Sequence, residues 1–135
     1  MKKLILSIVV VFGLVGFAAS HVEAQRKYGV KKSIAFKPGE TSKRIVSVLP
    51  TNREVHEYHF RAHAGQRMTV DLVSNDKNIG FYIMTIPDGY VLTTDVGVRR
   101  FDDTLPDTGE YKLIVETDTR GGSRYALEIV IDPRR

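Results

Sequence analysis

The stretch EVHEYHFRAHAGQRMTVDLVS, residues 54–74, shows most clearly how this chain folds. Its apolar side chains alternate with polar ones on both sides of a short turn at Ala64, Gly65 and Gln66. The apolar positions on either side of this turn are Tyr58, Phe60, Met68, Val70 and Leu72. A period of two places successive side chains on opposite faces of a β-strand. The stretch therefore predicts two strands, each with one buried face, joined as a hairpin.

Further short apolar runs follow the same pattern, each bounded by Gly, Pro, Asn or Asp. They are SIAFKPGETS (33–42), KRIVSVL (43–49), GFYIMTI (80–86), EYKLIVET (110–117) and RYALEIVID (124–132). The dense run at 80–86 indicates a central strand, and the last two runs predict a hairpin through Gly121 and Gly122. We expect about eight to nine short strands in one antiparallel β-sandwich, all-β in class, of a jelly-roll or related type.

The N-terminus has the pattern of a secretory signal peptide. Lys2 and Lys3 precede an apolar run from residue 4 to residue 19, which is short for a membrane-spanning helix. Small residues fit cleavage after Ala24, and a cut after Ser20 also fits. We therefore expect a periplasmic or secreted protein with no stable membrane anchor after cleavage. The expected organisation is a signal peptide (1–24), a polar leader (25–32) and a single sandwich domain (33–135).

Composition limits the classes of function. The chain has no cysteine, so neither disulfides nor a lipidated cysteine can hold the exported product. Lys plus Arg number 20 against 16 Asp plus Glu, and the basic pairs are scattered along the chain. Nucleic-acid binding needs a focused basic patch, so we expect no nucleic-acid partner.

Catalytic and metal motifs are weak. His56 and His59 are three residues apart on a predicted strand, which directs them to opposite faces. His59 and His63 could converge only if the strand bends before the turn at Gly65, and no Cys or third well-spaced ligand supports them, so we expect no metal and no cofactor. The sequence lacks a Gly-x-Ser-x-Gly elbow, and Asp102 and Asp103 are adjacent and point apart. An enzyme is therefore the least supported class, while weak calcium binding by SNDKN (74–78) or FDDT (101–104) stays open.

LPDTGEY, residues 105–111, contains the Leu-Pro-x-Thr-Gly pattern that sorting transpeptidases cleave. A sorting signal needs a long hydrophobic span behind it, whereas residues 112–135 alternate polar and apolar through two predicted strands. The stretch is better read as a tight turn that leads into a strand. Tyr111 has two interpretations: a buried ring whose hydroxyl caps the loop backbone, or direct contact with a partner.

The order of these signals resembles the bacterial pre-peptidase C-terminal (PPC) domain family. The matching elements are YHFRAHAGQRMTVDL, IPDGYVL, LPDTGEYKLIV and RYALEIVI, within residues 54–131. The resemblance implies a PPC-like β-sandwich. Because most matched positions are turn and core residues, it bears on architecture more than on function.

A narrower resemblance is to small exported inhibitors of goose-type lysozyme. IAFKPGETS and YHFRAHAGQ resemble the opening of that group, and LPDTGEYKL resembles its Leu-Pro-x-Ser-Gly-x-Tyr segment, with Thr in place of the usual Ser. The resemblance implies that Thr108, Gly109 and Tyr111 belong to a loop that enters the lysozyme cleft. Asp107 lies in the same turn, and Arg99 and Arg100 are candidate anchors, because arginine near an aromatic residue is common at interfaces.

The leading hypothesis is an exported, non-catalytic protein whose loops occlude the active-site cleft of a lysozyme. Many lysozymes are basic, so a mildly basic inhibitor would depend on local acids such as Asp102, Asp103 and Asp107. The alternative is a generic PPC-type envelope or secreted module that binds glycan or protein.

Overall fold

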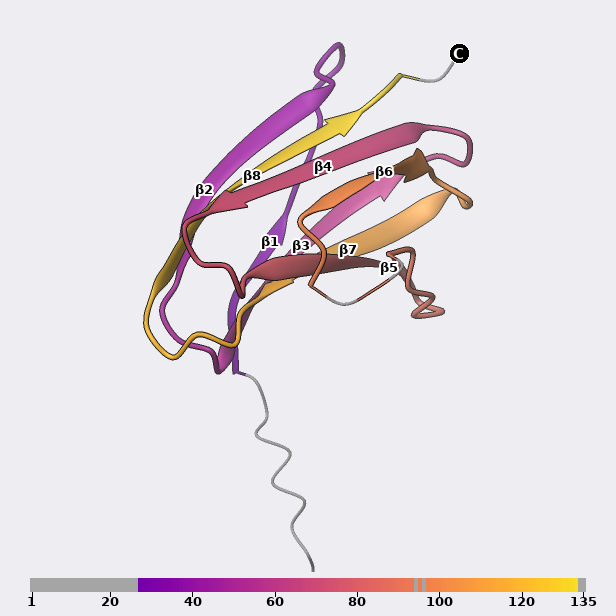
Figure 1. The fold of residues 1–135 in the computed structure, drawn as a ribbon. Helices are drawn as coiled ribbons and strands as arrows, with labels where there is room; N and C mark the ends of the chain where they lie inside the picture. Colours follow the sequence, from indigo (N-terminus) through magenta and orange to yellow (C-terminus); the bar gives the residue numbers. More distant parts are fainter. Residues whose placement is uncertain (1–26, 94, 96, 134–135) are drawn as a thin grey trace, which may run out of the picture.

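The structure, a computed structural model, consists of two four-stranded β-sheets packed face to face (Figure 1). It describes residues 27–93, 95 and 97–133, so the predicted signal peptide lies outside the described residues. The strands are β1 (Lys27–Ser33), β2 (Ser42–Leu49), β3 (Glu54–Ala62), β4 (Arg67–Ser74), β5 (Gly80–Ile86), β6 (Arg100–Thr104), β7 (Gly109–Glu116) and β8 (Ser123–Ile131). Within the described ranges no helix has the length and apolar character needed to cross a membrane. The predicted all-β sandwich is confirmed.

The two sheets have the strand orders β1-β3-β7-β5 and β2-β8-β4-β6. We call them sheet A and sheet B. Every pairing between the strands is antiparallel except that of β1 with β3, which is parallel. Inward side chains of both sheets form one core, in which Phe81, Ile83, Leu113, Leu127 and Ile129 are each fully buried.

Both predicted hairpins are wrong. β3 pairs with β1 and β7 in sheet A, whereas β4 pairs with β6 and β8 in sheet B, so the turn at residues 63–66 carries the chain from one sheet to the other. β7 and β8 are separated in the same way. Alternation identifies the buried face of a strand, but it leaves open whether the next strand lies beside it or across the core.

Two further expectations differ from the structure. β5 is an edge strand rather than a central one; single bridges from Val91 to Met84 and from Val98 to Phe81 cover its edge. This covering explains its apolar composition. The expected polar leader largely forms β1, which pairs with β3 from Lys27 to Ser33, because an edge strand can carry polar and charged side chains.

A buried polar group connects the two sheets. His56 on β3 is 2% exposed, and its Nδ1 lies 2.6 Å from the hydroxyl of Tyr125 on β8. The Tyr125 hydroxyl is also 2.5 Å from the hydroxyl of Tyr58. Burial lowers the pKa of His56 below its usual 6.5, and the nearby Glu54 opposes this only in part. The imidazole is therefore held neutral in the folded protein.

This burial predicts acid sensitivity. In the unfolded chain His56 takes up a proton near pH 6.5, whereas in the folded protein it does so only at a lower pH. The free energy of unfolding is therefore fully retained above pH 6.5 and falls as the pH drops toward the lowered pKa of the folded state. The midpoint of thermal unfolding should decrease across this interval. In His56→Asn, whose side-chain oxygen can replace Nδ1, that decrease should be much smaller, whereas the exposed His63→Gln should retain it. An equal pH dependence in His56→Asn would contradict this account.

Candidate functional site

The loop at residues 105–108 joins β6 to β7 at one end of the sandwich, beside the turn at residues 63–66 (Figure 1). Backbone hydrogen bonds join the two segments. Gly65 N–H donates to the Leu105 carbonyl at 2.9 Å, and Leu105 N–H donates to the Gln66 carbonyl at 2.8 Å. Leu105 is 1% exposed, so its side chain packs in the core and anchors the start of the loop.

Tyr111 supports this loop from behind. It is fully buried, and its ring stacks on Phe60 with centroids 5.5 Å apart. Its hydroxyl donates to the Asp107 carbonyl at 2.5 Å and accepts from the Asp107 N–H at 3.1 Å. Burial, the larger effect, raises the pKa of Tyr111, so the hydroxyl stays protonated and keeps its donor. The interpretation of Tyr111 as a buried ring that caps the loop backbone is confirmed.

Thr108 and Gly109 fix the backbone at the end of the loop that leads into β7. The hydroxyl of Thr108 accepts a hydrogen bond from the Ala64 N–H at 2.9 Å, and Gly109 has a φ of 155°, which side-chain-bearing residues rarely adopt. The side chains of Pro106, Asp107 and Thr108 remain exposed. The loop therefore presents an open tip on a backbone that is held at both ends.

The two candidate arginines lie elsewhere. Arg99 donates to the Ser74 carbonyl at 2.8 Å and to the Asp76 carbonyl at 3.2 Å, beyond the end of β4. The other end of β4 lies next to the loop, because Arg67 pairs with Thr104. Arg100 pairs with Asp71 at 3.8 Å. The structure thus brings Asp107, Thr108, Gly109 and Tyr111 together and leaves Arg99 and Arg100 toward the opposite end.

Of the acids that could face a basic partner, Asp107 is the most available. Asp102 receives two hydrogen bonds from Arg67, at 2.8 Å and 2.9 Å, and these, more than any other influence, lower its pKa. Asp103 accepts from the Thr104 N–H at 2.7 Å. The Asp107 carboxylate forms no hydrogen bond and no ion pair with a cation within the described residues, so no positive partner compensates its charge at the loop tip.

Sequence reasoning did not reveal that the turn at residues 63–66 supports this loop. Ala64 and Gly65 supply donors to it, and Gln66 bridges to the Asp132 carbonyl at 3.0 Å. The Ala-Gly-Gln signal marked a turn, but only the pairing of β3 with β7 and of β4 with β6 places that turn against residues 105–108. These contacts make the two segments one unit.

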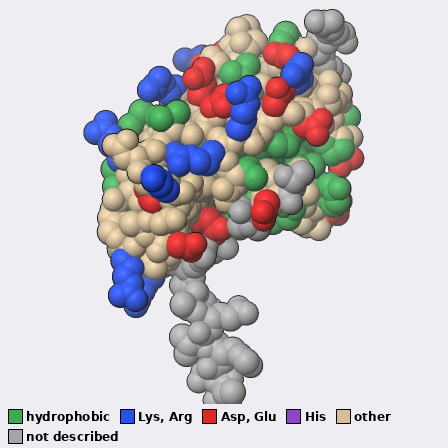
Figure 2. Space-filling model, viewed as in Figure 1, with side chains coloured by type: hydrophobic (Ala, Val, Ile, Leu, Met, Phe, Trp, Pro, Cys, Tyr) green, Lys and Arg blue, Asp and Glu red, His purple; other side chains and the backbone are tan. Residues whose placement is uncertain are grey.

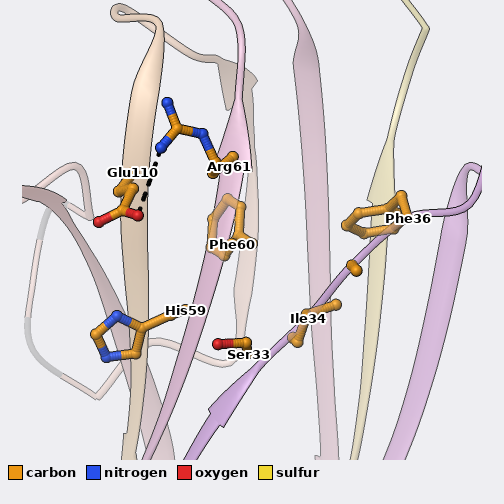
Figure 3. Close-up of a pocket in the computed structure, with 8 residues that line it drawn as sticks. Ser33, Ile34, Phe36, His59, Phe60, Arg61 and Glu110 are labelled. Carbon is orange, nitrogen blue, oxygen red and sulfur yellow. Dashed lines mark hydrogen bonds and ion pairs between the residues drawn. The ribbon is translucent and has the colours of Figure 1, made fainter.

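A shallow cleft of about 400 Å³ opens where the chain leaves β1 and crosses to sheet B (Figure 3). Ile34 and Phe36 lie on the segment after β1, across from Phe60 and Arg61 of β3. Arg61 reaches Glu110 at 3.5 Å. The cleft is open, and its ionisable side chains His59, Arg61 and Glu110 each have a partner, so it contributes shape more than chemistry.

The histidines do not converge. His56 lies in the core, whereas His59 faces the outer side of sheet A, where its Nε2 is 2.6 Å from the buried carboxylate of Glu57. Their predicted placement on opposite faces is confirmed. In the part of the chain that the structure describes, no three His, Asp or Glu side chains gather as metal ligands would.

Asp76, in the stretch considered for calcium, has a structural role. Its carboxylate accepts hydrogen bonds from Ser123 at 2.5 Å, Thr117 at 2.5 Å, Thr119 at 2.8 Å and the Asn78 N–H at 2.9 Å. Burial opposes the charge, but these donors together outweigh it and hold the pKa of Asp76 far below 3.8. The group ties the β4–β5 loop to the β7–β8 loop.

Comparison with known proteins identifies the class first: the chain has the sandwich fold of PPC-like domains. No family model and no characterised protein matches it by sequence. The solved PPC domain of a Bacillus anthracis collagenase matches with a TM-score of 0.50 at 12% identity, covering 78% of this chain and 96% of that one.

Two solved periplasmic inhibitors of g-type lysozyme, both named PliG, match with higher scores. The Aeromonas hydrophila protein gives a TM-score of 0.65 at 20% identity, covering 76% of this chain and 97% of its own. The Salmonella Typhimurium protein gives 0.58 at 24% identity, covering 76% and 98%. At these identities the likeness establishes the fold that the chain shares with these inhibitors.

Removing the Tyr111 hydroxyl should loosen the loop. Tyr111→Phe keeps the stacked ring but loses both hydrogen bonds to Asp107, so we expect a loss of about 1 kcal/mol in unfolding free energy. Hydrogen exchange at the Asp107 amide should also become faster. The exposed Tyr90→Phe is the matched control and should change neither quantity. Unchanged exchange at Asp107 would show that the hydroxyl does not hold the loop.

Asp76→Asn should be more damaging. An amide cannot accept four hydrogen bonds and carries no charge, so we expect a loss of about 2 kcal/mol at neutral pH in denaturant unfolding. Because the folded pKa is lowered, the contribution of Asp76 is present above 3.8 and lost as the pH falls below it. The difference from wild type should therefore shrink in acid, and a constant difference would contradict a role for the charge.

Proposed function

We propose that this protein is an exported, non-catalytic inhibitor of a goose-type lysozyme, acting in the periplasm or after secretion. Its loop at residues 105–109 would enter the enzyme's active-site cleft and exclude the substrate. The observation that carries the proposal is an exposed tip, Pro106 to Thr108, on a backbone held by Tyr111 and Ala64. The shared fold with the PliG inhibitors, over nearly their whole length, supports it.

The rigidity of the loop fits steric inhibition. A loop that is ordered before binding loses little conformational entropy when it inserts, so more of its contact energy appears as affinity. The uncompensated Asp107 carboxylate would attract a basic cleft rim. In this arrangement Asp107, Thr108 and Gly109 make the contact with the lysozyme. Tyr111 holds the loop backbone from the core side. Arg99 and Arg100 lie outside the contact.

The second candidate is a PPC-type accessory module that binds glycan or another envelope protein, and the match to the collagenase domain favours it. A single assay distinguishes the two candidate functions, because an accessory module would leave lysozyme activity unchanged.

The test is titration of the exported protein into goose-type, chicken-type and invertebrate-type lysozymes while cell-wall lysis is followed. We expect inhibition of the goose-type enzyme at micromolar protein. Asp107→Arg should weaken it about tenfold or more, because it places a cation at the loop tip. Asp118→Arg makes the same charge change in the exposed β7–β8 loop and should inhibit like wild type.

No inhibition of any lysozyme type would overturn the proposal. Equal weakening by Asp107→Arg and Asp118→Arg would show that net charge, rather than the loop, governs inhibition.

A further inference from the structure

The outer face of sheet B carries an exposed apolar row that the core does not use. Val46 on β2, Ala126 on β8 and Val73 on β4 are neighbours in register across three strands. Val46 is 52% exposed and Val73 is 68% exposed. Figure 2 shows hydrophobic, basic and acidic side chains interspersed over the part of the molecule where β2, β8 and β4 lie. A shallow groove of about 260 Å³ runs along it.

Two arginines flank this row. Arg44 lies two residues before Val46 on β2, and Arg124 lies two residues before Ala126 on the antiparallel β8. They therefore stand on opposite sides of the row. Neither side chain forms an ion pair or hydrogen bond with any residue that the structure describes. Both line the groove.

The remaining charges of this face are mostly compensated. Asp71 is 3.8 Å from Arg100, and Arg67 binds Asp102. Glu128 lies beside Arg44 in register, with no ion pair of its own among the described residues. Along the strands, the unpaired Arg44 and Arg124 thus lie on either side of the apolar row. The Glu128 carboxylate beside Arg44 reduces the positive potential at that side.

The spacing of this pattern is that of an extended chain. Arg44 is level with Glu128, which is four residues from Arg124. With a rise of about 3.4 Å per residue and about 4.8 Å between strands, the Arg44 and Arg124 Cα atoms are about 14 Å apart. Residues i and i+4 of an extended segment are separated by nearly the same distance, and residue i+2 lies between them on the same face.

We propose that the outer face of sheet B binds an extended acidic segment of a partner protein. In that segment two carboxylates at positions i and i+4 pair with Arg44 and Arg124, and an apolar side chain at i+2 packs on the row of Val46, Ala126 and Val73. This surface goes beyond the proposed inhibitory loop. The groove includes Ser74 and Asn75, at the end of β4 away from the loop, so both surfaces can be occupied at once.

Charge and side-chain type favour such a partner over a membrane or a second copy. The exposed apolar side chains on this face are valines, whereas membrane interfaces are enriched in Trp and Tyr. A second copy would add its own unpaired arginines, and among the described residues of this face it would offer only Glu128 as an acid without an ion pair to meet them.

The probe is the peptide acetyl-Glu-Thr-Val-Thr-Glu-amide, titrated into isotope-labelled exported protein while amide NMR shifts are followed. We expect shifts centred on Val46, Val73 and Ala126, with a dissociation constant on the order of 1 mM, since exposed ion pairs are weak. Peptides with Lys in place of both Glu, or with Ser in place of Val, should bind much more weakly. Added salt should weaken the binding of the acidic peptide.

Variants sharpen this test. Arg124→Ala should weaken binding about threefold, and Glu128→Gln should strengthen it by a similar factor, because it removes a negative charge next to Arg44 that repels the acidic peptide. Arg53→Ala, an exposed arginine outside this face, is the matched control and should bind like wild type. Thermal melting checks that each variant is folded.

Several outcomes would overturn the proposal. They are the absence of shifts on this face, equal binding of the lysine peptide, and weaker binding by Glu128→Gln. The same holds if phosphatidylglycerol vesicles shift these amides while the peptide does not, or if sedimentation shows a dimer that Val73→Lys dissociates.

Discussion

Two sheets bury their apolar faces against each other, and the remaining features of the structure rely on that packing. The chain has no cysteine, so the folded state depends on the shared core rather than on crosslinks. The contact also includes polar groups: His56, Tyr58 and Tyr125 are buried between the sheets and satisfy one another. A buried imidazole is tolerated because its nitrogen has a partner, and it fixes how β3 and β8 face each other.

The ends of the sandwich are organised by the same crossing of the chain between sheets. At one end, the turn at residues 63–66 passes from sheet A to sheet B and meets the loop before β7. At the other, Asp76 gathers donors from the β7–β8 loop. Each end is held by hydrogen bonds between segments distant in sequence. Exposed loop tips can therefore vary in chemistry while their backbones stay ordered.

The candidate loop shows how one side chain can serve structure and function together. Tyr111 occupies the core through its ring and reaches the loop through its hydroxyl. The face of sheet B works differently, because its features come from side chains that the core does not need. The exposed apolar row and two unpaired arginines cost the fold little, and their spacing follows from the pleat of the strands.

From the sequence alone, alternation at residues 54–74 and in the later runs determined the all-β class, the buried face of most strands and the opposite directions of His56 and His59. For Tyr111 it left two interpretations open, a buried ring that caps the loop backbone or direct contact with a partner. Only the tertiary structure decided that β3 and β4 lie in different sheets, that β5 is an edge strand, and that Arg99 and Arg100 are remote from the loop. The reason is that a period of two specifies which side of a strand is buried, whereas strand order depends on contacts between residues far apart in the chain.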